Sequence, residues 1–386
     1  MKRLYALLTF VASSVFAQSE PVTLPSPAVW LEPLNGDVAA LLQDSTLALT
    51  DGNTVYPVSK GWMGNSLLEY NSRILGNYQG QLAVPETDLL GPKLALYSHP
   101  AYLENGNIAA LADDGQHLLL LDETFEELTR APVQALPDAE IVTADLTGDG
   151  TDELVFLTDP TERYPHGVLG DGVEAASVSV FDTETLETIA SYTLPENYVF
   201  EQRRVLPFDL GDKDGLLATR SSEQTGAGVV LLEFRHGELQ LRAEAQPIGT
   251  GFRWLNLFAA RDGAAYAVRT PHIGGPFKRY TLRDSSFKVE QYDLGVTNHT
   301  LGSRNLDLGV LLPSVKPDTD HLVLPSQDLR TLKLIRCTPA TCEVINEFEL
   351  GGRLSSNVVF LEQDDRITIV AGDETARLHF WQIMSD

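Results

Sequence analysis

Residues 145–158 read DLTGDGTDELVFLT, and this stretch contains the two signals that decide the fold. Its first half concentrates Asp, Gly and Thr, which favour tight turns, and its second half is a short apolar run typical of a buried β-strand. The same succession of a polar turn and a short apolar run recurs along the chain, and convincing helical periodicity is absent. We therefore predict an all-β protein.

The predicted strands are short apolar runs, each bounded by Gly, Asp, Asn or Pro. Runs of this length between turn residues are typical of strands rather than helices. We predict strands at Val38–Leu42, Thr46–Leu49, Ile108–Leu111, His117–Leu121, Glu153–Thr158, Ser177–Phe181, Val229–Phe234, Ala265–Arg269, Leu322–Pro325, Arg366–Val370 and Leu378–Trp381.

These runs repeat as a unit: a first strand, a turn of Asp, Asn or Gly, two apolar strands and a weaker fourth strand. The turn recurs at 34–37, 104–107, 147–150, 211–215, 261–263, 317–320 and 363–365. Without a 17-residue leader the 386 residues leave 369, or about 53 for each of seven units. Because a unit of this size cannot bury its own faces, we predict a seven-bladed β-propeller of four-stranded antiparallel blades.

Two segments depart from the repeat. Gly61–Pro92 does not fit the unit, and we expect an insertion or a long connection between blades there. The last unit ends one strand early, so we expect Pro21–Leu24 to supply its outer strand and to close the ring. The predicted propeller covers residues 18–386.

Residues 1–17 have the pattern of a signal peptide. Lys2 and Arg3 precede an apolar stretch, Leu4–Val15, and Val15-Phe16-Ala17 places small residues where signal peptidase cleaves. A membrane anchor is the alternative, but a span needs about 20 apolar residues and this stretch has about a dozen. We expect an exported protein, periplasmic or extracellular, with no membrane insertion.

The two cysteines of the chain, Cys337 and Cys342, flank Thr-Pro-Ala-Thr at the tip of a predicted hairpin. The flanking strands are expected at Leu332–Arg336 and Glu343–Phe348. In an oxidising compartment a local disulfide is expected. A pair of zinc ligands is the alternative, but no second Cys or His pair completes a zinc site.

The charge of the chain excludes some partners. It carries 54 Asp and Glu against 28 Lys and Arg, a formal net charge of −26. Loss of Lys2 and Arg3 with the leader leaves 26 cations, a net charge of −28. Such a charge argues against a protein that binds nucleic acid or anionic membranes through its net field.

The stretch that decides the fold also arranges oxygen atoms around a tight turn. Asp145, Asp149 and Glu153 place carboxylates at positions 1, 5 and 9, and Thr147 places a hydroxyl at position 3. The carbonyl oxygen of Thr151 would add a ligand at position 7. Ca²⁺ prefers such oxygen ligands, so we predict a structural calcium site. A plain Asp-Gly turn without metal is the alternative.

This stretch resembles the calcium-binding loop of the FG-GAP/VCBS repeat family, whose members include the integrin alpha-subunit propeller and many secreted bacterial proteins. The family loop has the form D-x-[DN]-x-D-G-x-x-D, and this chain departs from it at Thr147 and Glu153. The other units keep the turn but lose ligands; one has Lys213 near the fifth position. The resemblance implies a propeller with calcium loops on one face and ligand binding on the other.

Cations gather in the segments that this arrangement places on the ligand-binding face. Arginines stand just before or at the start of four successive innermost strands, about 50 residues apart, and the loops between second and third strands add more cations. The predicted ligand-binding residues are Arg163, His166, Arg204 (with its neighbour Arg203), Arg220, Arg253, Arg269, His272, Arg304 and Arg353. Arg163–His166 and Arg269–His272 are both Arg-x-Pro-His runs.

Equivalent positions of a propeller lie side by side, so we expect these cations to line one mouth of the ring. Arginine suits bidentate recognition of carboxylate, sulfate or phosphate. The alternative is that each arginine pairs with an acidic residue of the neighbouring blade.

We therefore expect a monomeric, calcium-stabilised binding protein whose partner is an unidentified protein or an anionic glycan. The chain has no motif of a metalloprotease, a serine hydrolase or a phosphate-binding loop. Two alternatives remain: a propeller hydrolase or lyase acting on polysaccharide, with His166 and His272 in its cleft, and a non-catalytic scaffold for protein–protein interaction.

Overall fold

The computed structural model describes residues 16–313, 316, 318–363 and 366–384. Within them the chain forms β-strands and one 3₁₀ turn at Pro271–Ile273, which confirms the all-β prediction. No helix among the described residues is long and apolar enough to cross a membrane. The predicted leader lies mostly outside these residues, and its last two, Phe16 and Ala17, begin strand β1 (Phe16–Gln18).

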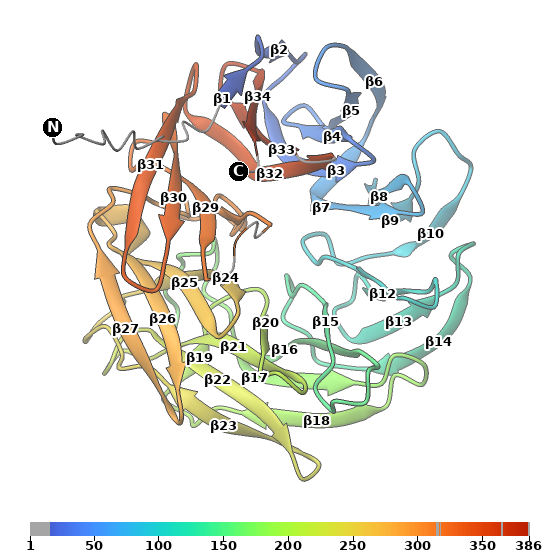
Figure 1. Ribbon diagram of the computed structural model, residues 1–386. Helices are drawn as coiled ribbons and strands as arrows, with labels where there is room; N and C mark the ends of the chain where they lie inside the picture. Colours follow the sequence, from blue (N-terminus) through green and yellow to red (C-terminus); the bar gives the residue numbers. More distant parts are fainter. Residues whose placement is uncertain (1–15, 314–315, 317, 364–365, 385–386) are drawn as a thin grey trace, which may run out of the picture.

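Most strands belong to units of four consecutive antiparallel strands arranged around a common centre (Figure 1). The first unit contains β3 (Ala28–Leu34), β4 (Asp37–Leu42), β5 (Thr46–Thr50) and β6 (Val55–Lys60), and the second contains β7 (Trp62–Tyr70), β8 (Arg73–Tyr78), β9 (Gln81–Ala83) and β10 (Leu90–Lys93). The third unit contains β11 (Ala101–Tyr102), β12 (Ile108–Leu111), β13 (His117–Leu121) and β14 (Glu127–Pro132). The fourth contains β15 (Val142–Ala144), β16 (Glu153–Thr161), β17 (Glu174–Phe181) and β18 (Thr188–Thr193).

The next three units repeat this order. They are β20 (Leu206–Asp209), β21 (Asp214–Ser221), β22 (Gly228–Arg235) and β23 (Glu238–Glu244); β24 (Leu255–Arg261), β25 (Ala264–Arg269), β26 (Phe277–Arg283) and β27 (Ser286–Tyr292); and β28 (Val310–Leu311), β29 (Asp320–Pro325), β30 (Thr331–Cys337) and β31 (Cys342–Glu349). A short strand, β19 (Val199–Phe200), bridges β17 and β21, so neighbouring units are hydrogen-bonded there.

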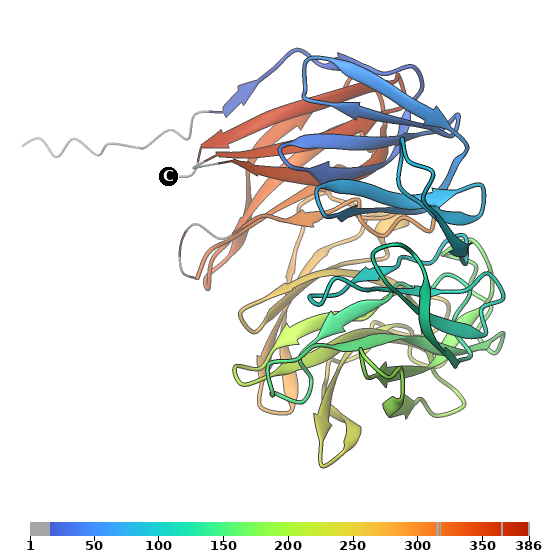
Figure 2. The same cartoon turned by 90° about the vertical axis from the view of Figure 1, so that its right-hand side faces the viewer.

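The last unit has three strands from the end of the chain: β32 (Leu354–Gln363), β33 (Arg366–Asp373) and β34 (Arg377–Met384). As predicted, a strand from the N-terminal segment completes it, because β2 (Val22–Thr23) pairs with the first part of β34. Strand β1 pairs with a later part of β34, opposite Trp381–Ile383. Figures 1 and 2 both place the first strands beside the last ones.

The described residues thus contain eight units, one more than the seven predicted. The predicted insertion, Gly61–Pro92, is wrong, because this stretch is the second unit, β7 to β10. Its first turn is Asn71-Ser72, in which both residues have positive φ. That turn has Asn but neither Gly nor Asp, at least one of which occurs in each of the other seven turns, and it therefore escaped the repeat pattern.

The remaining strand predictions are confirmed with small shifts at their ends. Ile108–Leu111 and His117–Leu121 coincide with β12 and β13, whereas the predicted strands Glu153–Thr158 and Ser177–Phe181 extend to the longer β16 and β17. These four strands are almost wholly buried along their apolar runs, which explains why apolar composition alone identified them.

Apolar clusters fill the spaces between neighbouring units. Trp30 of the first unit packs with Trp62 and Ile74 of the second, and every later pair of consecutive units shares a comparable cluster. The eighth unit shares one with the first, and Val22 and Leu24 of the N-terminal segment belong to it. The N-terminal segment thus contributes apolar side chains as well as strand hydrogen bonds.

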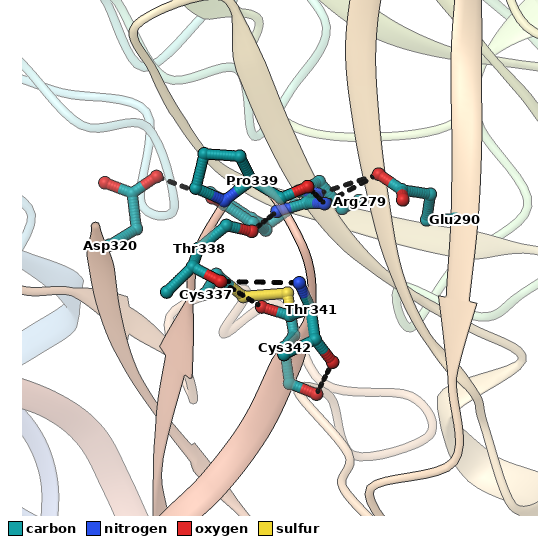
Figure 3. Close-up of a disulfide and its surroundings, with 9 residues drawn as sticks. Arg279, Glu290, Asp320, Cys337, Thr338, Pro339, Thr341 and Cys342 are labelled. Atoms are coloured by element: carbon teal, nitrogen blue, oxygen red, sulfur yellow. Dashed lines mark hydrogen bonds and ion pairs between the residues drawn. A yellow bond between two sulfur atoms is a disulfide. The ribbon is translucent and has the colours of Figure 1, made fainter. Parts of the chain in front are cut away.

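Cys337 and Cys342 form a disulfide between directly paired positions of β30 and β31, as predicted (Figure 3). Beside it the guanidinium of Arg279, on β26, donates hydrogen bonds to the carbonyl oxygens of Thr338 and Pro339. Arg279 also pairs with Glu290 of β27, at 2.7 Å. The hairpin tip of the seventh unit is therefore fastened to the sixth unit.

We predict that the N-terminal segment stabilises the whole fold. Replacing both Val22 and Leu24 by Ser should lower the free energy of unfolding by roughly 3 to 6 kcal/mol, because each fully buried aliphatic side chain contributes roughly 1.5 to 3 kcal/mol. Urea unfolding of the full chain measures this. Thr23→Ser, at the exposed position between them, is the matched control, and equal stability of the two proteins would contradict the prediction.

Candidate functional site

One loop of the fourth unit crosses toward the sixth and seventh units and covers part of the centre. This crossing loop, residues 162–173, joins β16 to β17. Its Val168 and Leu169 pack with Trp254 and Leu306, and the Val168 carbonyl oxygen accepts a hydrogen bond from the Gly302 backbone N–H at 2.9 Å. Predicted ligand-binding residues lie within or beside this loop.

Arg203 lies at the bottom of this region and is fully engaged. Its side chain is 1% exposed, and its guanidinium donates to the carbonyl oxygens of Asp138, Arg304 and Tyr97. It also pairs with the Glu140 carboxylate at 3.3 Å. Since each of the three guanidinium nitrogens donates a hydrogen bond to another segment, Arg203 connects these segments and does not face a ligand.

Arg204 and Arg304, predicted to face a ligand, also meet acidic residues. Arg204 pairs with Glu140 at 2.8 Å and with Asp307. Arg304 pairs with Asp138 at 3.1 Å and with Asp171 of the crossing loop. The structure therefore brings these arginines together at the centre, as the spacing predicted, but in the alternative arrangement in which acidic residues of other units neutralise them.

The pKa of Glu140 reflects this pairing. Burial alone would raise that pKa, but the charges of Arg204 and Arg203 hold it at about 2. In contrast, burial raises the pKa of Asp138 in spite of Arg203 and Arg304. The central network is thus an internal ion-pair system, in which removing one partner would leave a buried charge uncompensated.

The other predicted cations lie farther out, in three different situations. Arg163 and Arg269 donate to the carbonyl oxygens of Tyr198 and Ile248. Arg220 pairs with Glu244 at 2.6 Å and lies over the Tyr198 ring. Arg253 and Arg353 are exposed, and among the described residues their side chains have no hydrogen bond or ion pair.

Two carboxyl groups face each other beneath the crossing loop. Because β17 and β19 pair antiparallel with Ala175 opposite Phe200, Glu174 comes opposite Glu201. Both are buried, and one carboxyl oxygen of each has no hydrogen-bond partner among the described residues. Burial raises the pKa of both, and the charge of Glu201 raises that of Glu174 further. A second negative charge beside the first is unfavourable, so the protonated form of Glu174 is favoured.

Glu201 orients His166. Its carboxylate accepts a hydrogen bond from Nδ1 of His166, which directs Nε2 of that ring toward the surface, where the side chain is 20% exposed. The His166 ring lies 5.3 Å from the ring of Phe252, between centroids, and 5.8 Å from that of Tyr164. The Tyr164 hydroxyl is buried and has no hydrogen-bond partner in the part of the chain that the structure describes. Burial and the charges of Glu201 and Glu174 raise its pKa.

His272 is oriented in a different way. Its Nε2 lies 2.8 Å from Nδ1 of His299, and Nε2 of His299 lies 2.7 Å from the carbonyl oxygen of Ser303. Burial lowers the pKa of His299 to about 3, so that ring is neutral. Burial and the charge of His166 also lower the pKa of His272. His166 lies beside the Phe252 ring and His272 beside the Trp254 ring, two positions further along the same segment, so the two histidines belong to one region of the surface.

The predicted calcium loop forms the turn between β15 and β16. Asp145 accepts hydrogen bonds from the backbone N–H groups of Gly148 and Gly150, at 2.7 and 3.0 Å, and Glu153 accepts one from Leu146 at 2.8 Å. Asp149 accepts one from the Thr151 N–H, at 2.8 Å. Among the described residues no three His, Cys, Asp or Glu side chains are grouped to hold a metal ion. As placed, these oxygens bind their own backbone and do not converge.

A cleft of about 960 Å³ lies elsewhere, between the third and fourth units. Its lining includes Tyr97, Asp113, Thr158 and Phe181, but none of the predicted ligand-binding residues. The cleft and the histidine site are therefore separate features of the surface.

Sequence reasoning missed several residues of the site. Glu174 and Glu201 could have been found only from the pairing of β17 with the two-residue strand β19, which no pattern indicated. His299 lies in a connection without periodicity and was one of eight scattered histidines. The Arg-x-Pro-His repeat was the one local signal, and it identified His166 and His272.

Comparison with known proteins supports the fold. No protein-family model matches this sequence, and no curated protein matches it. Among solved structures, Saccharomyces cerevisiae Sqt1 has a TM-score of 0.61 at 10% identity, covering 94% of this chain and 98% of that one. BamB from Moraxella catarrhalis has 0.56 at 11% identity, covering 95% and 100%, and the Dos1 propeller 0.56 at 12%, covering 95% and 94%. These neighbours are β-propellers, and at such identities they show the fold alone.

We predict that Glu174 makes stability depend on pH. Its raised pKa means that the folded protein holds a proton that the unfolded chain releases above its ordinary value of 4.5. Stability should therefore fall as pH rises, by up to about 1.4 kcal/mol per pH unit. Glu174→Gln should reduce this slope in urea unfolding measured at a series of pH values from 5 upward. The exposed Glu184→Gln is the control, and an unchanged slope in Glu174→Gln would refute the assignment.

Proposed function

We propose that this chain is an exported β-propeller, closed into a ring by its N-terminal strand, that binds an acidic protein segment at one rim. The observation that carries the proposal is a set of exposed side chains around the histidine site. This docking rim consists of Arg163, His166, Phe252, Arg253, Ile273 and Leu301. Phe252 is 48% exposed, Ile273 81% and Leu301 67%.

The apolar members of the rim lie next to the paired rings of the site. Phe252 contacts the rings of Tyr164 and His166, at 4.9 and 5.3 Å between centroids. Ile273 follows His272 in the chain, and Leu301 lies two residues from His299, whose ring is 5.0 Å from that of His272. Large exposed apolar side chains that lie together mark interaction surfaces more often than isolated ones do.

The cations of the rim indicate the charge of the partner. The central arginines are already neutralised by carboxylates, which argues against an anionic ligand deep in the mouth. Arg253 is exposed and unpaired among the described residues, and Arg163 is exposed as well. In a protein of net charge −26 such a patch favours and orients an acidic partner.

We predict that rim substitutions abolish binding of short acidic ligands. A displayed peptide library selected on the wild-type protein should yield peptides rich in Asp, Glu and apolar residues. Their binding should fall at least about tenfold in Phe252→Ser/Arg253→Ser, because exposed anchor residues of an interface typically contribute 1 kcal/mol or more each.

Leu128→Ser is the matched control, since Leu128 is 54% exposed on β14 of another unit. Peptides that bind the rim variant and the control alike would overturn the proposal. Heparin and polygalacturonate, tested on the same variants, examine the alternative partner: binding of these polymers but of no peptide would replace the protein segment by an anionic glycan.

A structural calcium ion at the turn 145–153 stays a prediction, supported by the resemblance of its sequence to calcium-binding repeats. We expect isothermal titration calorimetry of the wild-type protein with Ca²⁺ to show one site, lost in Asp149→Ala. Bound calcium should also raise the melting temperature, since a ligand of the folded state alone stabilises it. If the wild-type protein shows no heat of Ca²⁺ binding, the turn is a plain hydrogen-bonded turn that binds no metal.

A further inference from the structure

The two Arg-x-Pro-His runs present one imidazole each to the same rim. His166 ends the first run, in the crossing loop, and His272 ends the second, in the loop between β25 and β26. His166 lies beside the Phe252 ring, and His272 stacks on the Trp254 ring at 6.1 Å between centroids. The charge of His166 reaches His272 and lowers its pKa, so the two rings interact.

The hydrogen bonds behind His272 fix its tautomer. A carbonyl oxygen only accepts, so Nε2 of His299 carries the hydrogen that it donates to Ser303. Nδ1 of the neutral His299 is then an acceptor, and Nε2 of His272 must donate to it across 2.8 Å. The lone pair of His272 is left on Nδ1. Since its pKa is lowered, that nitrogen is unprotonated at neutral pH and can accept a proton.

The hydrogen bond behind His166 suits this residue to the role of a general acid. A carboxyl oxygen of the buried Glu201 accepts the hydrogen bond from Nδ1 of His166 and so leaves Nε2 as the ring nitrogen that faces the surface. Glu174 lies opposite Glu201, and its raised pKa disfavours a second negative charge there. Nε2–H of His166 remains to donate a proton at the surface. An imidazole with a free lone pair beside a second imidazole with an outward ring nitrogen offers the base and the acid that general acid–base catalysis requires.

We propose that His272 and His166 form an acid–base site that hydrolyses carboxylic esters with an apolar acyl group. Nδ1 of His272 takes a proton from water as the water oxygen bonds to the carbonyl carbon. The bond from that carbon to the alcohol oxygen then breaks, and Nε2–H of His166 gives its proton to the leaving oxygen. One water is consumed, an acid and an alcohol form, and solvent returns the proton from His272 to His166. This activity goes beyond the proposed binding of a partner.

The surroundings favour an ester over two other substrates. Glycoside hydrolysis uses a pair of carboxyl groups at the substrate, whereas Glu174 and Glu201 are buried behind the histidine. A long phosphodiester polymer would extend beyond the cations of the rim and be repelled by the remaining surface of a protein of net charge −26. The exposed Phe252, Ile273 and Leu301 beside the imidazoles offer an apolar surface for an acyl chain.

Two butyrate esters separate the two roles. In 4-nitrophenyl butyrate the nitrophenolate leaves without a proton, so only the base is needed, whereas ethyl butyrate has a poor leaving group that needs the acid. Since a general acid or base contributes about 10²-fold to 10⁴-fold, His272→Gln should lower the rate on both esters by about 100-fold or more. His166→Gln should lower it similarly on ethyl butyrate and little on the nitrophenyl ester.

Glu201 acts through His166 and is a positioning residue. Glu201→Gln should reproduce the pattern of His166→Gln, with loss on the ethyl ester only, which a general loss of structure would not produce. His236→Gln is the control for unspecific catalysis by histidines, because His236 is exposed in the turn between β22 and β23. Circular dichroism and melting temperature verify that each variant is folded.

Two outcomes would overturn the proposal. The first is a wild-type rate on both esters no greater than that of the folded double variant His166→Gln/His272→Gln. The second is an equal loss on both esters in His166→Gln, which would remove its role as acid. The peptide-binding experiment can fail or succeed independently, because its variants, Phe252→Ser and Arg253→Ser, leave both histidines in place.

Discussion

The structure depends on one constraint: a four-stranded unit of about 46 residues cannot bury both of its apolar faces by itself. Each face must be covered by the next unit, and the shared clusters show that every unit is covered in this way. The first and last units meet under the same requirement, and for this reason Val22 and Leu24 return to the end of the chain. Positions far apart in sequence become neighbours as a consequence of this burial.

Arranging units around a centre concentrates their innermost residues, and this decides what the arginines do. Arg203, Arg204 and Arg304 come from two connections about 100 residues apart and meet Asp138 and Glu140 of a third connection. Buried charges are costly without partners, so a site that gathers cations at the centre must also gather carboxylates. The equivalent positions of these arginines in successive units suggested an anion-binding mouth. In the structure they form an internal ion-pair network instead. Of the predicted ligand-binding arginines, Arg253 and Arg353 are exposed and have no ion pair among the described residues.

The crossing loop gives the histidine site its character. By lying over the centre it buries Tyr164 and covers Glu174 and Glu201, and so it removes water from carboxyl groups that strand pairing has already set face to face. The raised pKa values of Glu174 and Glu201 follow from that burial, and Glu201 orients His166 through a hydrogen bond to its Nδ1. His272, held by His299, comes from a different unit and a different hydrogen-bond chain. The surroundings of His166 and His272 therefore differ, although both histidines come from an Arg-x-Pro-His run.

The sequence by itself determined the strands, their turns, the disulfide between Cys337 and Cys342, and the return of the N-terminal segment to the last unit. These features depend on local composition and on the need to cover apolar faces, which are readable along the chain. The sequence did not determine the number of units, because the Asn71-Ser72 turn of the second unit contains neither Gly nor Asp and was not recognised as part of the repeat. Only the tertiary structure decided which arginines are neutralised, that Glu174 faces Glu201, and that His299 supports His272. Those contacts join connections of irregular length, and a side chain in such a segment has no periodicity that predicts its direction.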